Sequence, residues 1–244
     1  MNARLAFVLA EIDAANAADP TADHACDRPA ALVYGERMSA ELARLFPDAS
    51  ESLTIAARGQ HIERWKSPRS AYPEGRAGYL SWRSDLARFH AERVGTIMLE
   101  AGYDEAECEA TATLLRKEEI KQNPDMQRLE DVICFVFVRH YLADFMPKHS
   151  IDDVKRILSK TARKMSPQAR QRMAEGVRPA RRPGACARPP RGRLTPRPDR
   201  SYQTRARFGA GPFALARFGS RHDGMSLRRV PPGELSMLEL VVSR

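Results

Sequence analysis

The stretch from Ile55 to His90 gathers more side chains suited to ligand chemistry than the rest of the chain. It holds both tryptophans, two of the six histidines, and six arginines. A guanidinium presents its N–H donors as a fork that matches the oxygens of a carboxylate or phosphate. An imidazole can accept or donate a proton near neutral pH. These residue types together predict a site for an anion.

The spacing within this stretch indicates how helices would present the side chains. His61 and Trp65 are four residues apart and Arg58 precedes His61 by three, so one helix over residues 50–65 would place all three on one face. We expect a loop over residues 66–77 and a second helix after it. The alternative is a histidine satisfied within its helix beside a solvated arginine face. The residues expected to hold an anionic ligand are Arg58, Arg64, Trp65, Arg69, Tyr72, Arg76, Tyr79, Trp82, Arg83 and Lys117.

The candidate catalytic residues are His61, His90 and Asp131, which belong to three separate predicted helices. Imidazole and carboxylate groups can bind a divalent cation, and such a cation can hold a phosphate. Spacing along the chain does not show that the three side chains meet, so neither a metal nor any other cofactor is identified. The pair Glu130-Asp131 has a second interpretation, as an acidic complement to a helix dipole.

Several common nucleotide and hydrolase motifs are absent from the chain. It contains no G-x-x-x-x-G-K, G-x-G-x-x-G, G-x-S-x-G or H-E-x-x-H pattern. Their absence argues against P-loop, Rossmann, hydrolase-elbow and zincin sites.

Hydrophobic spacing predicts an all-α fold: a single helical domain of seven or eight helices over residues 1–176. Capping residues mark several starts, among them Asp104, Ser150 and Ser166. The run Val132–Val138 is β-rich in composition and alone could form a buried strand. We expect a helix central to the core, because helical spacing continues on both sides and no other strand is available to pair with it.

Composition changes abruptly after residue 176. Residues 177–244 contain fifteen arginines, no lysine and four acidic residues, a net charge of +11, so the +9 of the whole chain leaves −2 for residues 1–176. This Pro- and Gly-rich segment is expected to be a disordered tail. Arginines interleaved with aromatic residues can bind RNA or acidic partners, so nucleic acid is expected at the tail or not at all. A GC-rich gene read out of frame, or a passive tail, would have the same composition.

The remaining composition predicts a soluble cytoplasmic protein. The four cysteines are scattered and form no C-x-x-C pair, which suits a reducing compartment. The N-terminus lacks the basic start and long apolar run of a signal peptide. No segment approaches the ~18 consecutive apolar residues of a membrane span. The oligomeric state is not predicted.

Six motifs carry a family resemblance: in chain order IAARGQHIERW, SPRSAYP, RAGYLSWR, FHAE, LRKEE and LEDVICFVF. Together they resemble the domain-of-unknown-function family four-two-zero-two, which occurs in bacteria, fungi and plants. The likeness covers about residues 3–175 and excludes the tail. It implies no particular activity, because that family is uncharacterised.

The order of histidines and acids is also distantly similar to the HD-type metal-dependent phosphohydrolases, which are all-α. That resemblance implies that His61 matches the histidine of their His-Asp pair, His90 a later histidine and Asp131 their late aspartate. It also implies that Lys117 contacts phosphate. Ile62 stands where the aspartate of the pair should be, and the first predicted helices carry no matching histidine.

Two functions follow from these patterns. The first is binding of a phosphorylated or otherwise anionic small ligand, with a degenerate HD-type phosphohydrolase as its catalytic form. The alternative is a non-catalytic interaction domain whose Arg-rich tail binds RNA or acidic partners. Whether the protein is an enzyme stays open at this point.

Overall fold

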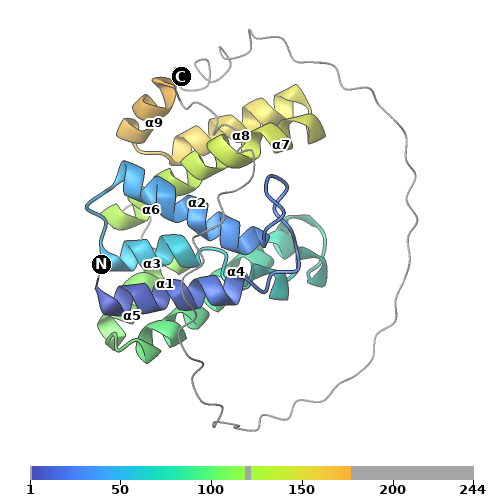
Figure 1. Ribbon diagram of the computed structural model, residues 1–244. Helices are drawn as coiled ribbons and strands as arrows, with labels where there is room; N and C mark the ends of the chain where they lie inside the picture. Colours follow the sequence, from blue (N-terminus) through green and yellow to red (C-terminus); the bar gives the residue numbers. More distant parts are fainter. Residues whose placement is uncertain (1, 119–121, 177–244) are drawn as a thin grey trace, which may run out of the picture. The chain divides into compact units, whose positions relative to one another are not determined.

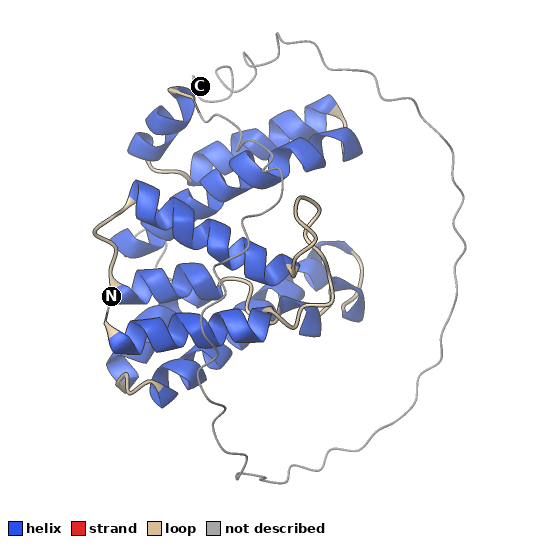
Figure 2. Cartoon of the chain, viewed as in Figure 1, coloured by secondary structure: helices blue, strands red, loops and turns tan. Residues whose placement is uncertain are grey.

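The computed structural model describes residues 2–118 and 122–176. Within these ranges every regular element is a helix, apart from one isolated β-bridge between Ala22 and Pro29 (Figures 1 and 2). The prediction of an all-α fold is therefore confirmed. The predicted tail, residues 177–244, lies outside the described residues.

The α-helices are labelled α, and the 3-10 and π-helical turns are labelled η. The elements in chain order are α1 (Ala3–Asn16), α2 (Ala30–Leu45), α3 (Glu51–Gly59), η1 (Arg64–Lys66), η2 (Arg69–Ala71), α4 (Gly75–Glu100), α5 (Glu105–Arg116), α6 (Pro124–Val136), η3 (Phe137–Tyr141), α7 (Leu142–Phe145), η4 (Met146–Lys148), α8 (Ile151–Lys164) and α9 (Pro167–Ala174).

The core forms where the first six helices pack together. α4 packs against α5, α3 contacts α1, α2 and α5, and α2 contacts α6 (Figure 1). Within α6, Val132, Phe135 and Val136 are almost completely buried. The apolar run is thus helical and central, as its flanks predicted. No helix in the described ranges combines the length and apolarity needed to cross a membrane.

Side-chain caps fix where several helices begin. Asp104 and Glu107 form the expected capping box, in which Asp104 Oδ1 accepts the N–H of Glu107 at 2.8 Å and Glu107 Oε2 accepts the N–H of Asp104 at 2.9 Å. Ser150 Oγ accepts the N–H of Asp153 at the start of α8, at 3.1 Å. Each cap satisfies a donor that the first helical turn leaves unpaired.

The third helix is shorter than predicted, and this places His61 in a turn. The sequence predicted one helix over residues 50–65, but α3 ends at Gly59 and the chain turns through Glu63, whose φ of 48° is left-handed. The side-chain oxygen of Asn16, at the end of α1, accepts the N–H of Glu63 at 3.0 Å. This buried contact stabilises the turn in place of a further helical hydrogen bond.

A π-helical turn, η3, joins the central helix α6 to α7. Such turns rotate the side chains that follow relative to an uninterrupted α-helix, and they are frequent at functional sites. Here the turn brings Phe137 and Tyr141 to the wall of a cavity.

Candidate functional site

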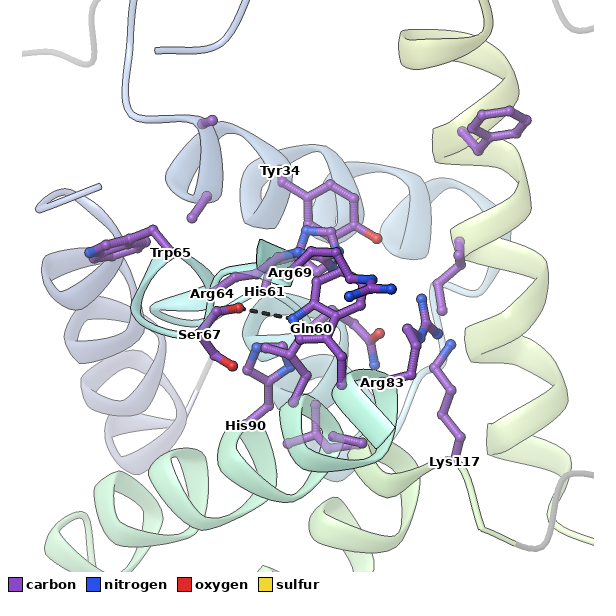
Figure 3. A pocket seen from close by; sticks show the side chains of 18 of the residues that line it. Tyr34, Gln60, His61, Arg64, Trp65, Ser67, Arg69, Arg83, His90 and Lys117 are labelled. Carbon is purple, nitrogen blue, oxygen red and sulfur yellow. Dashed lines mark hydrogen bonds between the residues drawn. The ribbon is translucent and has the colours of Figure 1, made fainter. Parts of the chain in front are cut away.

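A partly open cavity of about 1240 Å³ is lined by parts of α2, α4, α6 and α8, by the loops after α1 and α3, and by the turn after α5. A space of this size accommodates a small organic molecule. The side chains around it that can make polar contacts include Tyr34, Gln60, His61, Arg64, Ser67, Arg69, Arg83, His90 and Lys117 (Figure 3). Glu130 lines it as well.

His61 is held between an aromatic ring and a guanidinium. Its imidazole stacks on Tyr34 from α2, with ring centroids 3.7 Å apart and an interplanar angle of 14°. Nη1 of Arg64 donates to Nε2 of His61 at 2.9 Å. A guanidinium can only donate, so Nε2 accepts and the proton of the neutral ring sits on Nδ1.

Trp82 on α4 connects the loop to the wall of the cavity. Its indole N–H donates to the carbonyl of Ser67 at 2.9 Å, and the guanidinium carbon of Arg64 lies 4.9 Å from the indole centroid. Trp82 is buried, so both contacts are shielded from water. The indole therefore orients the loop backbone and the Arg64 guanidinium together.

Arg69 and Arg83 reach the cavity from different segments of the chain. Arg69, in the loop, donates to the carbonyl of Tyr72 at 2.9 Å and more weakly to that of Gly75 at 3.5 Å. Arg83, on α4, makes no hydrogen bond or ion pair to any described residue, and Figure 3 shows it beside Lys117. Neither guanidinium is neutralised by a carboxylate among the described residues.

Lys117 reaches the cavity because the backbone turns sharply after α5. It is the C-cap of that helix, with φ at 60°. Its ammonium donates to Glu130 of α6 at 2.7 Å. Burial lowers the pKa of Lys117, and the carboxylate only partly offsets this. Burial alone would raise the pKa of Glu130, but the ammonium of Lys117 holds it below its ordinary value.

Both histidines of the cavity are kept uncharged. Burial lowers the pKa of His61 well below its ordinary value, and the charges of Arg64 and Arg83 act in the same direction. Burial, with smaller contributions from the charges of Arg64 and Arg83, lowers the pKa of His90 to about 3. The two ring centroids are 6.4 Å apart. The cavity thus holds fixed positive charge beside two neutral imidazoles.

Comparison with known proteins gives the chain a family. The family model described as Domain of unknown function (DUF4202) matches residues 6–182. The chain belongs to the DUF4202 family. No curated protein and no solved structure matches it. The DUF4202 resemblance inferred from the six motifs is confirmed, whereas the more distant likeness to HD-type phosphohydrolases stays a prediction.

The structure of this DUF4202 member brings most of the predicted site residues together. Although the helix expected over residues 50–65 is interrupted, its last part still reaches the cavity, because the turn after α3 places His61, Arg64 and Trp65 at the cavity wall. Trp65 is set apart from the cationic groups in Figure 3. The predicted residues that line the cavity are His61, Arg64, Trp65, Arg69, Trp82, Arg83, His90 and Lys117.

Five predicted residues lie outside the cavity. Arg58 points the other way and forms a two-pronged ion pair with Asp13 of α1, at 2.6 and 2.5 Å. Arg76 and Tyr79 are exposed on the first turns of α4. The remaining two are Tyr72 and Asp131.

Asp131 has a structural task that the sequence did not indicate. Its carboxylate accepts the backbone N–H of Ser166 at 2.8 Å and the Ser166 hydroxyl at 2.7 Å, and Gln127 donates to it at 3.1 Å. Burial raises its pKa, against the effect of these hydrogen bonds. Asp131 therefore ties α6 to the start of α9, because Ser166 is the N-cap of that helix.

A divalent metal does not fit the cavity side chains that the structure describes. Within residues 2–118 and 122–176, no group of three or more His, Cys, Asp or Glu side chains is placed to hold one. Nε2 of His61 is occupied by Arg64, and Asp131 by Ser166. Ile62, at the position of the missing aspartate, is fully buried in the core. We therefore derive no metal-dependent step.

We expect Asp131→Asn to lower the free energy of unfolding by about 1–3 kcal/mol, because a buried acceptor of charge-assisted hydrogen bonds is lost. The same variant should bind anions as the wild type does. Chemical denaturation and calorimetric titration with phosphate measure the two effects. Loss of anion binding in a folded Asp131→Asn protein would show that this residue does belong to the site.

Three cavity residues were missed or passed over by sequence reasoning: Tyr34, Gln60 and Glu130. Tyr34 meets His61 from a helix far earlier in the chain, and no spacing rule connects them. Glu130 and Asp131 were considered as a pair, but adjacent helical residues point about 100° apart. Only Glu130 faces Lys117, while Asp131 faces α9.

Proposed function

We propose that the protein binds a small phosphorylated or otherwise anionic molecule in this cavity. The observation that carries the proposal is that Arg64, Arg69 and Arg83 line the cavity without a carboxylate partner among the described residues. Guanidinium groups that converge on one space match the oxygens of a phosphate.

Other partly buried arginines of the domain contrast with these three. Arg37 pairs with Asp23 at 2.7 Å, and Arg139 pairs with the buried Glu41 at 2.9 Å. Taking a cation out of water is costly unless a counter-charge accompanies it. Arg64, Arg69 and Arg83 therefore need an anion from outside the fold.

The carboxylates of the cavity wall do not meet this need, because each is already engaged. Asp19 accepts the backbone N–H groups of Thr21 and Ala31, whereas the other acids form ion pairs. Those pairs are Asp23 with Arg37, Glu118 with Arg116, and Glu130 with Lys117. Burial lowers the pKa of Arg64, and the uncompensated positive charge of Arg83 lowers it further. A bound anion would relieve this repulsion.

Hydrolysis is not part of the proposal. The degenerate HD-type enzyme expected from the sequence needs a metal set, and the described residues bring no such set together. The alternative of a tail that binds RNA or acidic partners concerns residues outside the described ranges.

The test is calorimetric titration of the full chain with inorganic phosphate, pyrophosphate and propyl phosphate. Arg83→Gln should weaken binding at least tenfold, since a hydrogen bond to a charged group contributes about 1.5–3 kcal/mol. Arg76→Gln is the matched control, because Arg76 lies on the same helix but outside the cavity. The proposal fails if none of these anions binds, or if the two variants lose affinity equally.

A further inference from the structure

We infer that the ligand carries hydroxyl groups beside its anionic group, as in a sugar or polyol phosphate, and that Gln60 and His90 bind those hydroxyls. The inference rests on the proposed anion site and names the class of molecule that it takes. It assigns the anionic group to Arg64 and Arg83 and the hydroxyl groups to the uncharged side chains of Gln60 and His90.

Two polar atoms of these uncharged side chains are left unsatisfied by the fold. Gln60 and His90 are 7% and 5% exposed. The amide nitrogen of Gln60 and Nε2 of His90 are buried, and neither has a hydrogen-bond partner among the described residues. Both residues line the cavity. Buried polar atoms are nearly always paired in folded proteins, so two unpaired ones at a cavity wall indicate partners supplied by a ligand.

The chemistry of these two groups selects a hydroxyl. The unpaired atom of Gln60 is its amide nitrogen, which is uncharged and donates hydrogen bonds, so it needs an oxygen that accepts one. The His90 imidazole is neutral near pH 7 and offers one donor and one acceptor. A ligand hydroxyl also donates one hydrogen bond and accepts others, so it complements either group. A second anionic group would instead be drawn to the guanidinium groups.

The size of the cavity and its aromatic rings narrow the class further. A volume of about 1240 Å³ is far more than an inorganic anion fills, so an organic portion is expected. One face of Tyr34 is covered by His61 at 3.7 Å, and Arg64 lies over Trp82 at 4.9 Å. The aromatic rings beside the cations are thus already engaged, which favours a hydroxylated ligand over one that stacks a flat ring.

The experiment compares phosphate esters of equal charge that differ in hydroxyl groups. Glycerol 3-phosphate is paired with propyl phosphate, and ribose 5-phosphate with pentyl phosphate. The full wild-type chain should bind at least one hydroxylated ester about tenfold more tightly than its alkyl partner. Gln60→Leu should remove most of that preference and leave the alkyl esters unaffected. Its unfolding midpoint should be unchanged or higher, because an unpaired buried amide is replaced by an apolar group of similar size.

The outcomes separate this inference from the proposed function. Equal affinity of the wild type for both members of each pair overturns the inference and leaves the anion site standing. Absence of binding by every ester and by inorganic phosphate overturns both. A Gln60→Leu protein that loses all esters equally also overturns the inference. The wild-type comparison needs no variant, so a Gln60→Leu chain that does not fold leaves the test decisive.

Discussion

Gly78→Ala will lower the free energy of unfolding by about 2–3 kcal/mol and weaken anion binding. A Cβ at Gly78 would lie 1.9 Å from the carbonyl oxygen of Pro73 and 2.7 Å from its carbonyl carbon. Both are backbone atoms, so no side-chain rotation can relieve the overlap and the loop before α4 must move. That loop holds Arg69 at the cavity through the carbonyls of Tyr72 and Gly75.

Gly95→Ala is the matched control in the same helix. A Cβ there meets no heavy atom within 4 Å. Because alanine favours the helix over glycine, this variant should gain about 0.5–1 kcal/mol. Urea denaturation of both variants measures the difference, and phosphate titration measures the affinity. A Gly78→Ala protein as stable as the wild type would contradict the close approach of the loop to α4.

Acidification from pH 7 to pH 5 will destabilise the protein, by about 2 kcal/mol through His90 alone. The pKa of His90 is about 3 in the folded state, against about 6.5 for an exposed histidine. As the pH falls below this ordinary value, the unfolded chain takes up a proton that the folded protein excludes. Stability is therefore lost as the pH falls. His61, whose pKa is also lowered, adds in the same direction.

His90→Leu isolates this contribution. Denaturation curves give the free energy of unfolding at pH 7 and at pH 5. Between these two values the variant should lose about 2 kcal/mol less than the wild type. Saturating phosphate should reduce the loss that remains, because an anion beside Arg64 and Arg83 counteracts their effect on His61. If the two proteins lose stability equally, His90 is not held neutral by its surroundings.

Local signals were enough to predict much of the fold. The capping box of Asp104 and Glu107 and the cap at Ser150 depend on residues three apart, and each begins a helix where the sequence placed it. The apolar run of α6 could be recognised as helical because its flanks keep the helical spacing. Such contacts lie within one turn, so a single sequence contains all their partners.

Contacts between distant segments could not be predicted in this way. α3 stops at Gly59, where a Cβ would lie 2.7 Å from Val94 of α4, and the turn after it depends on Asn16 of α1. The stacking of Tyr34 on His61 joins two further distant segments. The arginine cluster was found because its members share one stretch of sequence. The partners from other helices required the structure.

The most direct test of the anion site is a crystal structure of the full chain grown with tungstate. Tungstate is an oxyanion, and its tungsten atom can be located by anomalous scattering. We predict a strong anomalous peak inside the cavity, bounded by Arg64, Arg69 and Arg83. Tungstate bound at surface arginines with none inside the cavity would contradict the proposal that this cavity is an anion-binding site.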